Sequence, residues 1–156
     1  MKGKKMPLLH IENLTKSYKG KKALDAVTLD FTVGVNALLG ANGSGKSTMM
    51  NIISTALSPT GGAVYYDGRE ICSLGTEYRK VMSVLFQHQP YFPSVTVNDY
   101  MLYNAALKGM SGKDRQAVID NSLKRLNVLD CKAKKLKELS GGLRQRVFIA
   151  QKIMNE

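Results

Sequence analysis

The stretch "LLGANGSGKSTMMNII", residues 38–53, places three glycines, two serines and a lysine between two apolar runs. Residues 40–47 fit the pattern G-x-x-x-x-G-K-[ST], in which glycines let backbone N–H groups close around phosphate oxygens. The residues that follow predict a helix, whose N-terminus adds a partial positive charge. A turn that only joined a strand to a helix would explain the glycines but not the Gly-Lys-Ser order. The stretch therefore predicts a binding site for a triphosphate.

Two side chains of this loop have distinct predicted tasks. Lys46 would reach the β- and γ-phosphates, and the hydroxyl of Ser47 would bind Mg²⁺. The whole predicted phosphate site consists of Gly40, Ala41, Asn42, Gly43, Ser44, Gly45, Lys46, Ser47 and Thr48.

The segments around the loop carry strand patterns. Residues 27–33, "VTLDFTV", alternate apolar and polar side chains, which predicts a strand with one buried face. Residues 35–39, "VNALL", and 81–86, "VMSVLF", are nearly all apolar, as expected of strands covered on both faces in a parallel sheet. Asp67-Gly68 predicts the turn of a hairpin. Strands around a phosphate loop and its helix predict an α/β fold.

After the proline-bounded loop "QHQPYFP", residues 87–93, the pattern becomes helical. Thr96 with Asp99, and Ser111 with Asp114, each place a hydroxyl three residues before a carboxylate, which is the capping-box spacing. A third helix is expected to begin near Ser140. The second helix would bury Ile119, Leu123 and Leu126, and the third Leu143, Val147, Ala150 and Met154.

Composition limits the class of protein. With 156 residues and 44% hydrophobic content, the chain can bury the core of about one domain. It has neither an apolar run long enough to span a bilayer nor an apolar leader, so we expect a cytoplasmic protein. Cys72 and Cys131 fit no metal-ligand spacing and no disulfide framework. The net charge of +11 suggests either a polyanionic partner or a solvated basic surface.

A second motif lies downstream, where "ELSGGLRQRV", residues 138–147, places Ser140-Gly141-Gly142 at a predicted helix start. Alone, it would be an ordinary serine cap. After a phosphate loop, and with Gln87 between the two, it resembles the signature of ATP-binding cassette (ABC) proteins. The resemblance covers the chain from Leu8 onward, and the motifs occur in the order typical of that family.

The resemblance implies a P-loop NTPase core with an N-terminal antiparallel β subdomain and a small helical signature subdomain. It divides a partial nucleotide-binding domain, residues 1–156, into a β subdomain with P-loop core (8–90), a helical subdomain (91–145) and a signature helix (141–156). It also implies ATP and Mg²⁺ as ligands.

Further residue roles follow from the resemblance. Tyr18 matches the aromatic that stacks on adenine, although a half-buried strand aromatic would also fit. Gln87 matches the residue that contacts Mg²⁺ or the attacking water, although a loop amide without a partner is the alternative. Ser140, Gly141 and Gly142 match residues that act in trans on the γ-phosphate held by a second protomer, so a head-to-tail dimer is expected.

The sequence departs from the family pattern in two ways. Leu143 occupies the position of the usual signature glutamine, so that side chain's contact is lost. The Walker B carboxylates and the switch histidine of the family are absent from these residues, which leaves the sheet incomplete and no candidate catalytic base. We therefore expect residues 1–156 to be part of a longer ATPase, and to bind ATP without hydrolysing it.

The predicted function is that of an ABC transporter ATP-binding subunit, which couples ATP hydrolysis to transport through a separate membrane permease. Such a subunit would lie on the inner face of the cell membrane and would need no specific nucleic acid. Two alternatives remain: a soluble ABC-type ATPase acting on DNA or ribosomes, which would use the basic charge directly, and a nucleotide-binding module that never hydrolyses.

Overall fold

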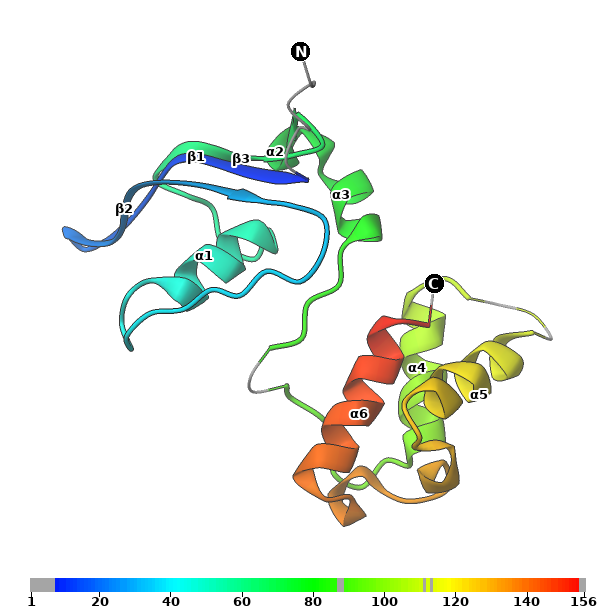
Figure 1. The fold of residues 1–156 in the computed structure, drawn as a ribbon. Helices are drawn as coiled ribbons and strands as arrows, with labels where there is room; N and C mark the ends of the chain where they lie inside the picture. The colour runs from blue at the N-terminus through cyan, green and yellow to red at the C-terminus, as the bar shows by residue number, and fades with distance from the viewer. Residues whose placement is uncertain (1–7, 87–88, 111, 113, 155–156) are drawn as a thin grey trace. The chain divides into compact units, whose positions relative to one another are not determined.

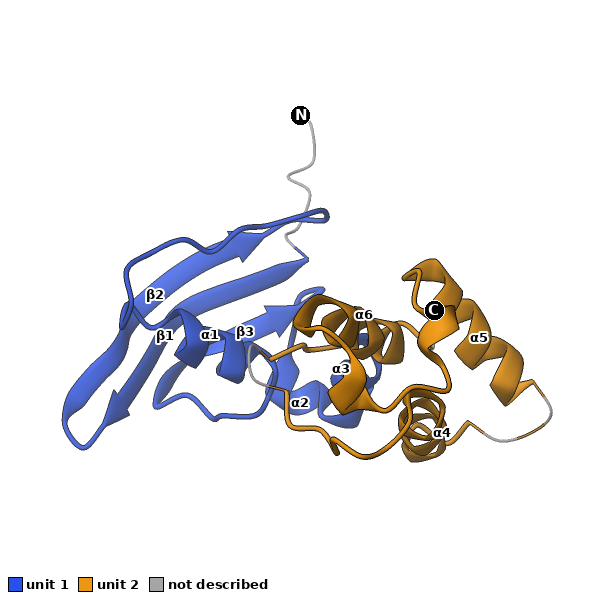
Figure 2. Ribbon diagram, turned by 90° about the horizontal axis from the view of Figure 1, so that it is seen from below, with its two compact units in different colours: residues 1–82 blue, residues 83–156 orange. Residues whose placement is uncertain are grey.

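The computed structural model describes residues 8–86, 89–110, 112 and 114–154 (Figure 1). The chain divides into two compact units, residues 1–82 and 83–156 (Figure 2). Each unit has its own core. The division by contacts falls between Met82 and Ser83, and the functional subdomains expected from the sequence stay a prediction.

The first unit is an antiparallel sheet with one helix against it and two short helices at its end (Figure 1). Its four strands have the spatial order β2-β1-β3-β4, which confirms the expected N-terminal antiparallel β subdomain. In chain order the elements are β1 (Leu9–Tyr18), β2 (Lys21–Phe31), α1 (Lys46–Ile53), β3 (Gly61–Tyr66), β4 (Arg69–Glu70), α2 (Ile71–Leu74) and α3 (Thr76–Val81).

The expected hairpin is confirmed, because β3 and β4 pair antiparallel on either side of Asp67 and Gly68. Both turn residues have positive φ, 48° and 75°, which suits the tight turns that join twisted strands. The alternation expected for residues 27–33 holds through Phe31, where β2 ends. Val33 lies beyond the strand and is exposed, so that end of the prediction is wrong.

The core of the first unit lies between the sheet and its helices. Met49 and Ile52 of α1 are buried, as the apolar pattern after the loop predicts. They join buried side chains of the strands and of α2 and α3 in one cluster: Ile11, Leu14, Leu24, Val64, Ile71 and Tyr78. This packing fixes the position of α1, and with it the loop at the start of α1.

The two buried parallel strands expected at residues 35–39 and 81–86 are not formed. Residues 35–39 form no strand, and Val35 and Leu39 are exposed. Val81 is the last residue of α3, and residues 82–86 are irregular. A strand that is covered on both faces needs hydrogen-bonded neighbours, and every paired strand among the described residues belongs to the antiparallel sheet. Apolar sequence alone does not provide such a neighbour.

The second unit is helical. It contains α4 (Val97–Leu107), α5 (Arg115–Arg125), two single 3-10 turns, η1 (Leu129–Cys131) and η2 (Leu136–Glu138), and α6 (Gly141–Lys152). Its core includes Ile119 and Leu123 of α5 and Val147 and Ala150 of α6, all with 0% exposure. Leu126 and Leu143 are partly buried against this core and Met154 is buried, which confirms both predicted apolar faces.

Hydroxyl caps begin two of these helices. The Thr96 hydroxyl accepts a hydrogen bond from the Asp99 backbone N–H at 3.1 Å, as its spacing predicts. Ser140 caps α6 in the same way. The capping box expected at Ser111 lies outside the described residues, although α5 itself begins one residue after Asp114.

Candidate nucleotide-binding site

The predicted phosphate loop joins residues 35–39 to the first turn of α1. Gly45 caps α1 with φ 89° and ψ 0°, in the left-handed region that favours glycine. A Cβ atom on Gly45 would lie 2.5 Å from the backbone oxygen of Ala23 and 2.7 Å from the Leu24 side chain. Strand β2 therefore approaches the loop so closely that only glycine fits at this position.

The Lys46 ammonium group lies inside the loop. It donates hydrogen bonds to the carbonyl oxygens of Gly40 and Ala41, at 2.7 and 2.6 Å, and to the Ser44 hydroxyl at 3.2 Å. Two backbone carbonyl oxygens of the phosphate loop thus hold the ammonium group that is expected to reach the phosphates. A Cβ atom on Gly40 would come within 2.8 Å of the Ser44 hydroxyl oxygen, so a larger residue there would displace the Ser44 side chain.

The first turn of α1 supplies further groups for an anion. The first N–H groups of a helix have no partner within it, and the first turn of α1 contains no acidic side chain that would compensate them. Ser47 is exposed and Thr48 partly buried at this end of the helix. The loop, the lysine and the helix start therefore fit a phosphate chain, and Ser47 is placed where its hydroxyl could bind Mg²⁺ beside that chain.

Tyr18 ends β1 in the same unit. Its side chain is 47% exposed, and the Lys16 ammonium lies 5.5 Å from the ring centroid. Lys16 also donates to the carbonyl oxygen of Ser58 at 2.7 Å, which ties this strand end to the segment after α1. An exposed ring is available for stacking on a base. The adenine contact itself stays a prediction.

The second predicted motif begins α6 in the helical unit. The Ser140 hydroxyl accepts a hydrogen bond from the Leu143 backbone N–H at 3.3 Å. Gly141 and Gly142 are exposed, and a Cβ atom on either would meet no atom of the described chain within 4 Å. The packing of this chain therefore does not require glycine there. The two glycines leave the helix start open to a group that approaches from outside.

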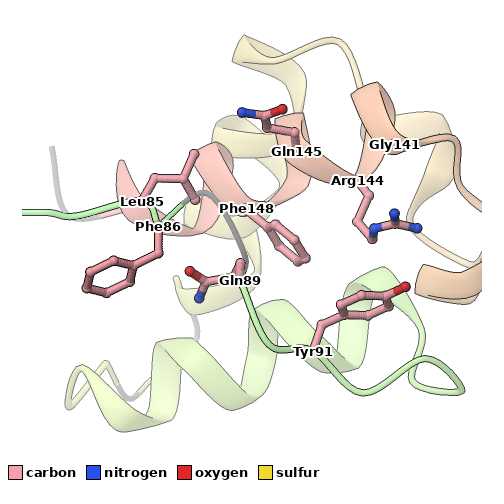
Figure 3. Close-up of a pocket in the computed structure, with 8 residues that line it drawn as sticks. All are labelled: Leu85, Phe86, Gln89, Tyr91, Gly141, Arg144, Gln145 and Phe148. Atoms are coloured by element: carbon pink, nitrogen blue, oxygen red, sulfur yellow. The ribbon is translucent and has the colours of Figure 1, made fainter. Parts of the chain in front are cut away.

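A cavity of about 240 Å³ lies beside this helix start (Figure 3). Gly141, Arg144 and Phe148 of α6 line one side of it, and Gln89 and Tyr91 line the other. The Tyr100 ring packs against Phe148. Burial raises the pKa of the Tyr100 hydroxyl, so this hydroxyl stays neutral. Neither Arg144 nor Tyr91 belongs to a motif that the sequence predicts. The only signal was position, since Arg144 follows the motif directly.

The predicted site residues do not all belong to one described unit. Gln87, the expected partner of Mg²⁺ and of the attacking water, lies outside the described residues, as does His88. Gly40 to Thr48 and Tyr18 belong to the first unit, and Ser140 to Gly142 to the second. Within the described ranges, no group of three or more histidine, cysteine, aspartate or glutamate side chains could hold a metal ion.

The loop, the helix that it begins and the sheet define an α/β protein with a nucleotide-binding P-loop. The sequence profile of the family described as "ABC transporter" matches residues 24–156. The chain therefore belongs to the ABC transporter family, and it has the fold of part of an ATP-binding subunit of that family. No helix within the described ranges has both the length and the hydrophobicity to cross a bilayer.

Solved structures agree with this assignment. CbiO1 from Clostridium perfringens, described as part of the ABC transporter complex cbiONQ, is 28% identical with a TM-score of 0.81. The match covers 96% of this chain and 62% of CbiO1. MJ1267, described as an ATP-binding cassette of an ABC transporter, is 28% identical with a TM-score of 0.83, covering 96% of this chain and 65% of MJ1267.

A third structure, described as the ATP-binding subunit of an ABC transporter, is 22% identical with a TM-score of 0.75, and it supports the fold alone. That match covers 94% of this chain and 62% of the other. The chain thus spans less than two thirds of the length of each of these three proteins.

Proposed function

We propose that this chain binds Mg-ATP as the ATP-binding subunit of an ABC transporter, and that it acts through a separate membrane permease. The observation that carries the proposal is the loop of residues 40–48, in which Lys46 is held by three hydrogen bonds at the start of an acid-free helix. Bound nucleotide would place its phosphates against this lysine and the first N–H groups of α1.

The assembly partners follow from the second motif. The open start of α6, with Ser140, Gly141 and Gly142, would contact the γ-phosphate bound by a second protomer in a head-to-tail dimer. CbiO1 is described as part of a transporter complex, and this supports a membrane permease as the further partner. Such a subunit would lie at the cytoplasmic face of the membrane.

Hydrolysis requires groups that residues 1–156 do not provide. No Asp or Glu follows an apolar strand after residue 142 in the sequence, so no residue here is assigned to deprotonate or orient the attacking water. We propose that these residues bind Mg-ATP but do not turn it over by themselves.

Replacement of Lys46 tests the proposal. Lys46→Ala should weaken Mg-ATP binding by about 1.5–3 kcal/mol, the usual value of a hydrogen bond to a charged group. Isothermal titration calorimetry of residues 1–156 measures this loss. Lys80→Ala, which removes an exposed lysine of α3 in the same unit, is the matched control and should bind as the wild type does.

Equal affinities of the wild type and Lys46→Ala would contradict the assignment of the loop. The salt dependence of DNA binding tests the alternative of a nucleic-acid function. Binding to an arbitrary DNA duplex should be weak and should disappear by physiological salt if the charge is only a basic surface, whereas tight binding that persists there would favour the DNA or ribosome alternative.

A further inference from the structure

We propose that Arg144 is a positioning residue that fixes the open start of α6 to the segment that follows Gln87. The inference rests on the proposed function, because it assigns the γ-phosphate contact to Ser140, Gly141 and Gly142. All the residues that carry it belong to the helical unit. Arg144 itself touches no nucleotide in this role.

The Arg144 guanidinium makes two contacts at once. Its central carbon lies 4.8 Å from the centroid of the Tyr91 ring, and Nη1 donates to the carbonyl oxygen of Leu139 at 3.3 Å. Figure 3 shows the guanidinium extending from α6 toward the Tyr91 ring. Leu139 directly precedes Ser140. One side chain thus connects the residue before the signature serine to an aromatic residue four positions after Gln87.

The Tyr91 ring is itself held in place. It packs against Phe148 at 5.9 Å between centroids, and Phe148 packs against Tyr100 of α4 at 5.6 Å. Phe148 and Tyr100 are both buried. Because the ring has little freedom to move away, the cation–π contact can transmit position as well as contribute energy.

The backbone makes the same connection farther along both segments. Lys137 N–H donates to Pro93 O and Leu136 N–H to Val95 O, at 3.0 and 2.9 Å. Val97 N–H donates to Lys134 O and Asn98 N–H to Lys132 O, at 2.9 and 3.0 Å. These four bonds, which we call the 93–137 ladder, join residues 93–98 to residues 132–137. Beyond the ladder, the side chain of Arg144 joins Tyr91 to Leu139.

The chemistry of this position requires arginine. A planar guanidinium can stack on a ring and still donate from its edge, whereas the compact ammonium of lysine can do only one of these at a time. The neighbouring Leu143 side chain packs against the core cluster, so it does not anchor the helix start by a polar contact. The Leu143 backbone N–H binds the Ser140 hydroxyl within the first turn, and the Arg144 side chain connects Leu139, the residue before Ser140, to Tyr91 of another segment.

Hydrogen exchange without nucleotide tests the contact directly. Arg144→Leu should speed exchange of the amides of Leu143 and Val95, which donate to the Ser140 hydroxyl and to the Phe92 carbonyl oxygen, by about two- to fivefold, the range for a partly exposed cation–π pair. Arg144→Lys should lose the same protection although its charge is kept. Tyr91→Phe retains the ring and should exchange as the wild type does. In a Tyr91→Leu background a further Arg144→Leu change should have a smaller effect than in the wild type, because only the bond to the Leu139 carbonyl oxygen is left to lose.

Arg146→Leu is the matched control, since it removes an exposed arginine two residues along the same helix. If its exchange rises as much as that of Arg144→Leu, or if the effects at Arg144 and Tyr91 simply add, the positioning role is wrong. Should Arg144→Leu fail to fold, the comparison of Arg144→Lys with Tyr91→Phe decides in the same way.

A nucleotide readout separates positioning from general stability. Arg144→Lys should leave the Mg-ATP dissociation constant unchanged, because the P-loop lies in the other unit, and should raise the protein concentration needed for ATP-dependent self-association by the same two- to fivefold. A changed dissociation constant would overturn the proposal. Failure of the wild type to bind Mg-ATP would instead refute the proposed function, and the exchange series would still report on Arg144.

Discussion

Among the described residues, the starts of α1 and α6 are both rich in glycine and serine, and glycine has a different reason in each. At the start of α1, Gly45 has φ 89° and faces the Ala23 carbonyl oxygen, which would lie 2.5 Å from an added Cβ. At the start of α6, Gly141 and Gly142 face open space. The first glycine is required by the fold. The fold does not require Gly141 or Gly142. Open space at these positions is expected if the helix start receives a group from outside the chain.

The largest loss of stability is expected at Gly45, where an added Cβ would meet the Ala23 carbonyl oxygen. Gly45→Ala should destabilise the first unit by about 2–4 kcal/mol, because left-handed strain and a backbone collision add. Gly43→Ala separates the two causes, since Gly43 has φ 82° but nothing within 4 Å of an added Cβ. It should cost only about 1 kcal/mol. Urea unfolding of both variants measures the difference, and equal losses would show that the collision is relieved elsewhere.

A smaller effect on stability, of opposite sign, is expected at the start of α6. Gly142→Ala should stabilise the helical unit by about 0.5–1 kcal/mol, because alanine is the better helix former. The same methyl group should weaken ATP-dependent self-association, since it projects where the phosphate of the second protomer is expected. Arg146→Ala, at an exposed position of the same helix, controls for general effects on α6. Gly142→Ala that destabilises the unit would remove the contrast between the two helix starts.

The smallest effect uses acid to tell the two units apart. In the helical unit, Asp120 accepts hydrogen bonds from Lys132 at 2.6 Å and Gln116 at 2.9 Å. The bond from Lys132 lowers the pKa of Asp120, and burial opposes this. A carboxyl with a lowered folded pKa stabilises the fold above its unfolded value of about 3.9, and this contribution is lost as pH falls through the folded pKa.

Because both side chains of this pair are about a third exposed, Asp120→Asn should cost only about 0.5 kcal/mol at neutral pH. The variant should also lose less stability than the wild type as pH falls from about 5 through that unfolded pKa and the lowered folded one. Denaturant unfolding monitored by exchange in residues 83–156 measures this. Asp130→Asn, at an exposed carboxylate of η1, is the control. Identical pH slopes for wild type and Asp120→Asn would show that the pair contributes nothing.

The parts of the fold that could be predicted are those in which a local rule decides the structure. The Asp67-Gly68 turn, the Thr96 cap and the buried face of α6 each depend on residues a few positions apart, and all three are present. The buried strands expected at 35–39 and 81–86 were wrong, because strand formation depends on a distant partner that an apolar run does not specify.

The candidate site shows the same division. Lys46 and the glycines of the P-loop could be located from spacing alone, since the motif fixes a short segment of backbone. The contact between Arg144 and Tyr91 could not, because neither residue type nor spacing connects positions so far apart in the chain. The collision that makes Gly45 obligatory also depends on β2, which the sequence does not place against the loop.

The 93–137 ladder also bears on how this unit tolerates changes of length. Its four bonds hold both ends of residues 99–131, which include most of α4 and all of α5. Because the entropy of closing a loop rises only slowly with its length, extra residues between Leu107 and Arg115 would cost little while the ladder stays intact. The start of α6 therefore keeps its geometry, while the segment between α4 and α5 can become longer during evolution at little cost.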